Sequence, residues 1–133
     1  RGIGGATDPQ QHYENGVRAA MQMYTIYDPS FVITDAQVDA YLAARPYNGT
    51  VEQIFTQMWI SKFMNWWDAW ADYRRTGFPV LQQVNYPGNN SGGQIPRRLR
   101  LPLHEVALNF ENYSAGATSP DKPETRVWWD GGN

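Results

Sequence analysis

The sequence contains no cysteine, and its only two histidines, His12 and His104, lie far apart in the chain. Without cysteine, a disulfide scaffold, a thiolate metal site and a cysteine nucleophile are all excluded. Neither histidine has a second histidine four residues away, so the ligand spacing of a zinc or iron site is also missing. We therefore expect no metal centre and no cofactor, and we interpret both histidines as surface or hydrogen-bonded side chains.

The chain also lacks a large net charge and a long apolar run. Its formal net charge is -2, which gives no global field that would favour nucleic acid or an anionic membrane. No stretch approaches the length of a transmembrane helix, and the opening RGIGGATDPQ does not form a signal peptide. The chain begins without methionine, so we expect an internal start within a longer protein.

Two helices are predicted in the first third of the chain. The first spans residues 8–27, with Asp8 as its N-cap and one apolar stripe at helical spacing. The stripe consists of Tyr13, Val17, Ala20, Met21 and Tyr24. The second helix begins after a capping box of Thr34 and Gln37, and it ends before Pro46.

A third, longer helix is predicted from Thr50 to the glycine stop at Gly77, with a second capping box between Thr50 and Gln53. About 25 residues at a rise of about 1.5 Å each would give a rod of roughly 37 Å. One face of this helix carries Phe55, Trp59, Phe63, Trp66, Trp70 and Tyr73. Because these rings recur at helical spacing, we expect them to form a buried spine.

Proline and glycine concentrate in the second half, which predicts a loop-rich region over residues 76–133 after a helical region over residues 8–75. Residues 101–113 are expected to hold one or two helical turns, and residues 125–130 a short extended segment. The fold class is mainly α, with helical hairpins of tetratricopeptide-like type, then long irregular coil and little or no sheet. We treat residues 1–133 as a single fragment.

Candidate catalytic groups are weak. Asp68 and Asp72 lie one helical turn apart, as an acid/base pair could, but Arg75 follows three residues after Asp72, where helical ion pairs form. Glycosidase carboxylates usually flank a cleft rather than share one helix. No Gly-x-Ser-x-Gly elbow occurs either. The chain is therefore predicted not to be an enzyme.

Arginines gather in two places, at Arg74 and Arg75 and at Arg97 and Arg98. A phosphate or nucleic-acid patch is one interpretation. Against it, the net charge is acidic, and IPRRLRLP places the second group, with Arg100, among proline and leucine. Since the guanidinium has five donors that suit carbonyls and carboxylates in coil, we favour structural roles for all four and expect no nucleic-acid partner.

Three tryptophans lie off the main stripe or in coil, namely Trp67, Trp128 and Trp129, and these are the candidate ligand-binding residues. Aromatic faces can bind the apolar C–H surface of sugar rings. For any single tryptophan, burial in a core is the competing interpretation. Trp67 could also stack on the guanidinium of Arg74, seven residues further on.

Several segments resemble, in order, the C-terminal part of the SusD/RagB-like outer-membrane lipoproteins of Bacteroidetes. The matching pieces are YENGVRAAMQMY, ITDAQVDAYLA, VEQIFTQMWISKFMNWWDAWADYRRTGFPVL, IPRRLRLPLHEVALNFENY and RVWWD. The chain departs from the family pattern at Asn65-Trp66, where Asn-Gly is frequent, and in lacking the N-terminal portion with its lipidation cysteine.

The resemblance implies a non-catalytic glycan- or nutrient-binding protein, lipid-anchored at the surface of the outer membrane. Its expected partners are a TonB-dependent, SusC-like transporter, an oligosaccharide or other nutrient, and the N-terminal portion of its own protein. The alternative is a scaffold segment that contacts the transporter and the rest of its own chain without binding ligand itself.

Overall fold

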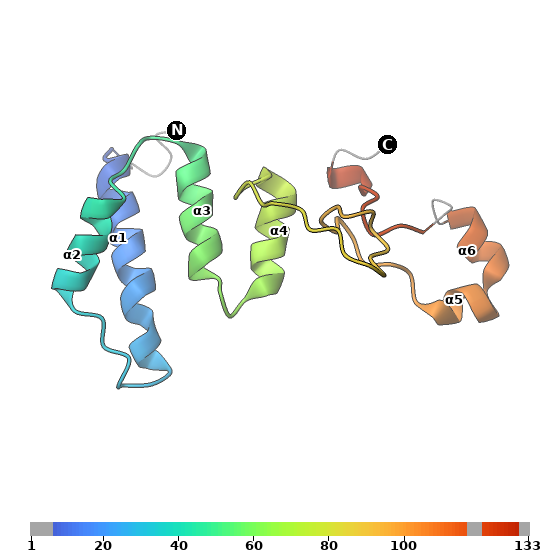
Figure 1. Cartoon of the computed structure of the whole chain (residues 1–133), viewed down its shortest axis with the longest axis horizontal. Coiled ribbons are helices and arrows are strands. Elements are labelled where there is room, and N and C mark those ends of the chain that lie inside the picture. Colours follow the sequence, from blue (N-terminus) through green and yellow to red (C-terminus); the bar gives the residue numbers. More distant parts are fainter. Residues whose placement is uncertain (1–6, 117–120, 131–133) are drawn as a thin grey trace. The chain divides into compact units, whose positions relative to one another are not determined.

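The computed structural model describes residues 7–116 and 121–130, and within those ranges the chain consists of helices and coil without a strand. The mainly α class is therefore confirmed. The chain divides into two compact units, Arg1–Pro79 and Val80–Asn133, and each is described here by itself (Figure 1).

The first unit opens with α1 (Pro9–Gln22), which runs on into a short 3-10 helix, η2 (Met23–Ile26). Asp8 caps α1 by accepting a hydrogen bond from the backbone N–H of Gln11 at 3.0 Å. Proline occupies the first helical position, where its missing N–H costs nothing. The helix predicted for residues 8–27 is confirmed.

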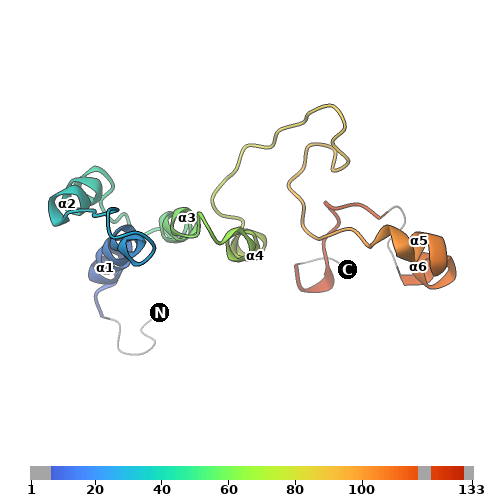
Figure 2. The same cartoon turned by 90° about the horizontal axis from the view of Figure 1, so that it is seen from below.

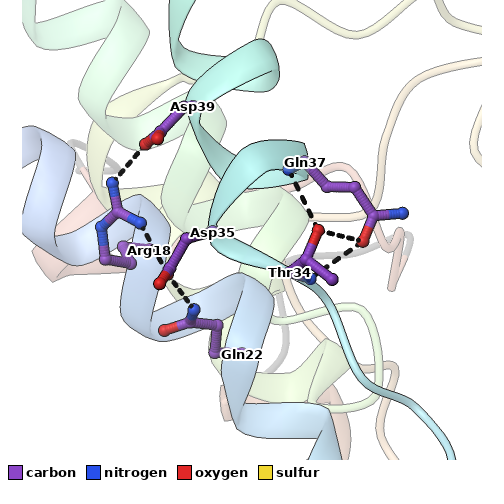
Figure 3. Close-up of polar contacts among 6 residues, drawn as sticks. All are labelled: Arg18, Gln22, Thr34, Asp35, Gln37 and Asp39. Atoms are coloured by element: carbon purple, nitrogen blue, oxygen red, sulfur yellow. Dashed lines mark hydrogen bonds and ion pairs between the residues drawn. The ribbon is translucent and has the colours of Figure 1, made fainter.

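The second helix, α2 (Asp35–Ala44), begins at the predicted capping box, in which Thr34 and Gln37 exchange side-chain and backbone hydrogen bonds. Arg18 of α1 joins the two helices by pairing with Asp35 at 3.0 Å and with Asp39 at 2.6 Å (Figure 3). The first turn of α2 is thus held both by its own cap and by α1.

A small core lies between α1 and α2. Val38 is completely buried, and Tyr13 and Val17 of α1 are nearly so. The Tyr13 hydroxyl donates to the backbone carbonyl of Arg45 at 3.1 Å, and its ring lies 5.4 Å from that of Tyr47. Burial of the hydroxyl raises the pKa of Tyr13 above its usual value.

The single long helix predicted from residue 50 to 76 is wrong. Two helices occupy this region, α3 (Val51–Ser61) and α4 (Trp66–Thr76), which run antiparallel side by side (Figures 1 and 2). Between them the chain reverses, with the Asn65 N–H bonded to the Lys62 carbonyl at 2.8 Å. The reversal moves the aromatic rings off one common stripe, because the two halves now point in opposite directions.

The ends of this hairpin were only partly predicted. Thr50 caps α3, and Gly77, with φ 77°, ends α4 in the left-handed region, as expected. The second capping box is wrong, because the Gln53 side chain instead bonds the Asn48 N–H and the Pro46 carbonyl, both at 2.8 Å.

Asp72 ties α4 to α3. Its carboxylate pairs with Lys62, just beyond the end of α3, at 2.5 Å and with Arg75 at 2.7 Å. The Arg75 guanidinium in turn lies 5.1 Å from the ring centre of Phe55 on α3. Partial burial of the Asp72 carboxyl acts to raise its pKa, but the two cations outweigh this and leave the pKa below its usual value.

The second unit is mostly coil. Among its described residues, the helices are α5 (Leu103–Leu108), α6 (Phe110–Gly116) and the 3-10 turn η3 (Trp128–Asp130). The helical turns predicted within residues 101–113 are confirmed. The extended segment predicted for residues 125–130 is wrong at its end, where the chain coils into η3.

Replacing Asp72 with Asn should lower the free energy of unfolding by about 2 kcal/mol at neutral pH, because charge-assisted hydrogen bonds to Lys62 and Arg75 are lost. A carboxyl whose folded pKa is lowered contributes its stability above its unfolded pKa of about 3.9 and loses it as pH falls through the lower folded pKa. The difference between variant and wild type should therefore shrink below about pH 4.

Urea denaturation between neutral and acid pH measures this effect, and Asp68→Asn on the exposed side of α4 is the control. A difference in unfolding free energy that does not change with pH would contradict the assignment of the effect to the Asp72 charge.

Candidate functional site

The reversal between α3 and α4 carries an exposed aromatic cluster, which we call the aromatic turn: Phe63, Met64, Asn65, Trp66, Trp67 and Asp68. Every one of these side chains is exposed. Phe63 is 77% exposed and Trp66 is 60% exposed, so the predicted burial of these two rings in a helical spine is wrong. The physical reason is the reversal of the chain, which places both rings at the tip of a hairpin.

Within the aromatic turn, the indoles of Trp66 and Trp67 stack on each other. Their ring centres are 3.9 Å apart and their planes differ by 26°. The Trp70 ring follows at 5.8 Å from Trp67, and the Arg74 guanidinium lies 3.9 Å from the Trp70 ring centre. The structure thus places the Arg74 cation over Trp70 rather than over Trp67.

Polar groups lie next to the stacked indoles. The Asn65 amide donates to the Asp68 carboxylate at 2.6 Å, and both side chains are exposed. Asp72, by contrast, is engaged by Lys62 and Arg75. The two carboxylates of α4 therefore have separate environments, and one is neutralised by cations, which is not the arrangement of an acid/base pair.

A second feature of the first unit is an apolar groove of about 690 Å³ between α1, α2 and α3. Its lining is largely apolar and includes Tyr13, Met21, Tyr24, Ile54, Met58 and Ile60. On its polar side, the Tyr41 hydroxyl donates to the side-chain oxygen of Gln57 at 2.9 Å. The groove was not predicted from the sequence, because its walls come from three separate helices whose packing no single segment determines.

In the second unit, two arginines bind buried carboxylates across the coil. Arg97 makes a two-pronged contact with Asp130, with one Nε–Oδ2 distance of 2.7 Å, and Arg98 pairs with Asp121. The backbone N–H groups of Arg97 and Arg98 both donate to the Pro123 carbonyl, at 2.7 and 3.1 Å. Segment 97–98 is thus joined to segment 121–130 by side chains and backbone together.

Trp128 and Trp129 lie on η3, directly before the buried Asp130. Trp128 is 83% exposed and Trp129 is 49% exposed. Because Asp130 is held by Arg97, the turn that carries the two indoles is anchored at its end. The remaining candidate, Trp67, is 49% exposed in the first unit.

Groups suited to metal chemistry are absent from the described parts of the chain, where no three His, Cys, Asp or Glu side chains gather. Within the same residues, no helix combines the length and apolar character that crossing a bilayer requires.

The comparisons with known proteins agree with the motif resemblance. The profile of the SusD-like_2 family, described as "Starch-binding associating with outer membrane", matches residues 1–102. The chain belongs to the SusD-like family. This description is of binding proteins rather than enzymes. No curated protein sequence matches this chain significantly.

Two solved structures resemble this SusD-like chain closely. One, named "Bacteroidetes AC2a SusD-like", is 34% identical with a TM-score of 0.78, and the alignment covers 94% of this chain and 26% of the other. The second, named "chitin-binding protein", is 33% identical with a TM-score of 0.74, and covers 94% and 29%. The chain therefore spans about a quarter of the length of these relatives.

The substitution Arg97→Ala should unfold the coil of the second unit, because the buried Asp130 carboxylate loses its two-pronged partner. We expect the free energy of unfolding to fall by about 3 kcal/mol. Hydrogen exchange at the amides of residues 97 and 98 measures the loss locally. Arg100→Ala is the matched control, because its side chain is 47% exposed and stands 3.7 Å from Asp121. Equal exchange rates in both variants would refute a structural role for Arg97.

Proposed function

We propose that this chain is part of a non-catalytic glycan-binding protein that serves nutrient uptake at the outer membrane. The observation that carries the proposal is the match over residues 1–102 to a family described as starch-binding and associated with the outer membrane. A structure named "chitin-binding protein" at 33% identity supports the same ligand class. Starch and chitin are both neutral polymers of pyranose sugars, so the shared chemistry is recognition of such rings.

We assign the whole protein to a lipid-anchored position at the cell surface, working with a SusC-like, TonB-dependent transporter. The binding protein would capture an oligosaccharide and hand it to the transporter without making or breaking a covalent bond. The low net charge of -2 suits a neutral ligand that is recognised by ring stacking and hydrogen bonds rather than by a strong field.

The ligand contacts that we propose in this chain are the exposed indoles of Trp67, Trp128 and Trp129. Exposed tryptophans offer an apolar face together with an N–H donor, a combination suited to sugars. In the second unit, the anchored η3 turn supports the proposal for Trp128 and Trp129, because a site needs side chains whose positions are fixed before the ligand arrives.

A second candidate function is that of a scaffold which binds no ligand itself. The apolar groove between α1, α2 and α3 favours it, since a groove lined by methionine, isoleucine and tyrosine suits coverage by polypeptide. The occupant would be the N-terminal portion of the same protein, because the relatives are about fourfold longer than this chain.

The test is calorimetric titration of the full-length protein with chito- and malto-oligosaccharides, and of the double variant Trp128→Ala, Trp129→Ala. The glycan-binding proposal expects the variant to lose affinity by about tenfold or more with its unfolding midpoint unchanged, as truncating central aromatic contacts usually costs over 1 kcal/mol. A lower unfolding midpoint with unchanged affinity would favour the scaffold. Wild-type protein that binds no oligosaccharide would refute the glycan proposal.

A further inference from the structure

The aromatic turn has a property that the other exposed apolar residues of the first unit lack. Elsewhere in the described part of this unit, the exposed apolar side chains are aliphatic, such as Ile26 and Val32, or are rings without a face-to-face partner, such as Tyr27, which lies tilted at 6.4 Å from Tyr24. At the aromatic turn, two indoles stack face to face beside an amide and a carboxylate. This composition is that of a small-molecule site, in which aromatic walls combine with a few fixed polar groups.

The stacked indoles form the outer end of an ordered row. The row runs from the Arg74 guanidinium through Trp70 and Trp67 to Trp66. Arg74 lies over one end, and Trp66, at the other, is 60% exposed. Packing within the row restricts the side-chain torsions of the indoles, so a ligand that stacks there pays little ordering entropy.

Two polar residues flank the tryptophan pair in the sequence, Asn65 before it and Asp68 after it. Asn65 and Asp68 are hydrogen-bonded to each other, which orients both. The amide can donate and accept hydrogen bonds, and the carboxylate accepts strong hydrogen bonds from sugar hydroxyls. The Asp68 carboxylate also repels a negatively charged ligand. Stacked indoles with these polar groups suit hydroxylated rings that carry no negative charge.

We propose that Trp66 and Trp67 form a sugar-binding platform, on which a pyranose ring of a neutral glycan stacks against Trp66 while Asn65 and Asp68 bind its hydroxyls. The C–H face of such a ring meets the electron-rich face of the indole. The inference rests on the proposed glycan-binding function, and it adds a ligand contact, Trp66, and the exclusion of anionic polysaccharides.

The competing occupant of the aromatic turn is another part of the same polypeptide. Polypeptide that covers the turn would bury Phe63 as well as Trp66, since both are exposed side chains of the same six-residue turn. A sugar stacked on Trp66 needs no contact with Phe63. Truncating Phe63 and truncating Trp66 should therefore have similar effects if polypeptide covers the turn, and different effects if a sugar binds there.

The experiment compares the full-length wild type with Trp66→Ala, Trp67→Ala and the matched control Phe63→Ala. Calorimetric titration uses chito- and malto-oligosaccharides as neutral probes and oligogalacturonate as an anionic probe. Tryptophan emission during the titration reports whether the ligand contacts indoles, and urea denaturation reports stability. We expect affinity for a neutral probe to fall about tenfold or more in both tryptophan variants, with the Phe63 variant unchanged.

Four results would overturn the inference. If both tryptophan variants bind neutral glycans as tightly as the wild type, Trp66 and Trp67 are not ligand contacts, and the proposed function is unaffected. Equal loss of stability in the Trp66 and Phe63 variants, with affinity intact, would show that polypeptide covers the turn. Tighter binding of oligogalacturonate than of neutral probes would refute the selection against charge. Absence of any glycan binding by the wild type would refute the proposed function itself.

Discussion

The ion pair between Lys62 and Asp72 holds the reversed hairpin of α3 and α4, and the exposed aromatic surface of the first unit depends on that reversal. Lys62 stands just after α3 and Asp72 in the middle of α4, so their contact requires the chain to double back between them. A continuous helix would separate these residues by about 15 Å along its axis. The reversal that brings the two charges together also places the rings of Phe63 and Trp66 at the tip of the hairpin. The ion pair therefore forms only in the reversed chain, in which Phe63 and Trp66 lie at the surface.

Much of the helical architecture was predictable because its signals are local. Asp8, Thr34 and Gly77 act as helix boundaries through their own side chains or backbone freedom, and all three do so in the structure. The break at residues 62–65 was not predictable in this way. It contains no proline or glycine, and the aromatic spacing across it continues the helical period. The one signal for a turn was the Asn-Gly that is frequent in the family at positions 65–66, which this chain replaces with Asn65-Trp66.

The residues of the candidate site also differ in whether local sequence signals indicate them. Trp67, Trp128 and Trp129 are predicted ligand contacts because they fall off the stripe or in coil. Trp66 was assigned to the core, and its exposure follows from the reversal alone. The apolar groove was missed because its walls come from three helices, and which faces meet is a property of packing rather than of any one segment. Spacing within a segment predicts its faces but not their partners.

The two carboxylates bound by Arg97 and Arg98 have a consequence for how this coil can vary. Asp121 accepts a hydrogen bond from the Leu101 N–H at 2.9 Å as well as pairing with Arg98. Residues 101 and 121 therefore lie close together, and the chain between them forms a loop with fixed ends. The excursion between these points includes α5 and α6 and is pinned at both ends. Lengthening a loop with fixed ends costs little, about 0.6 kcal/mol for each doubling. Insertions within this loop are therefore expected to be tolerated, because they leave the Arg97–Asp130 and Arg98–Asp121 contacts in place.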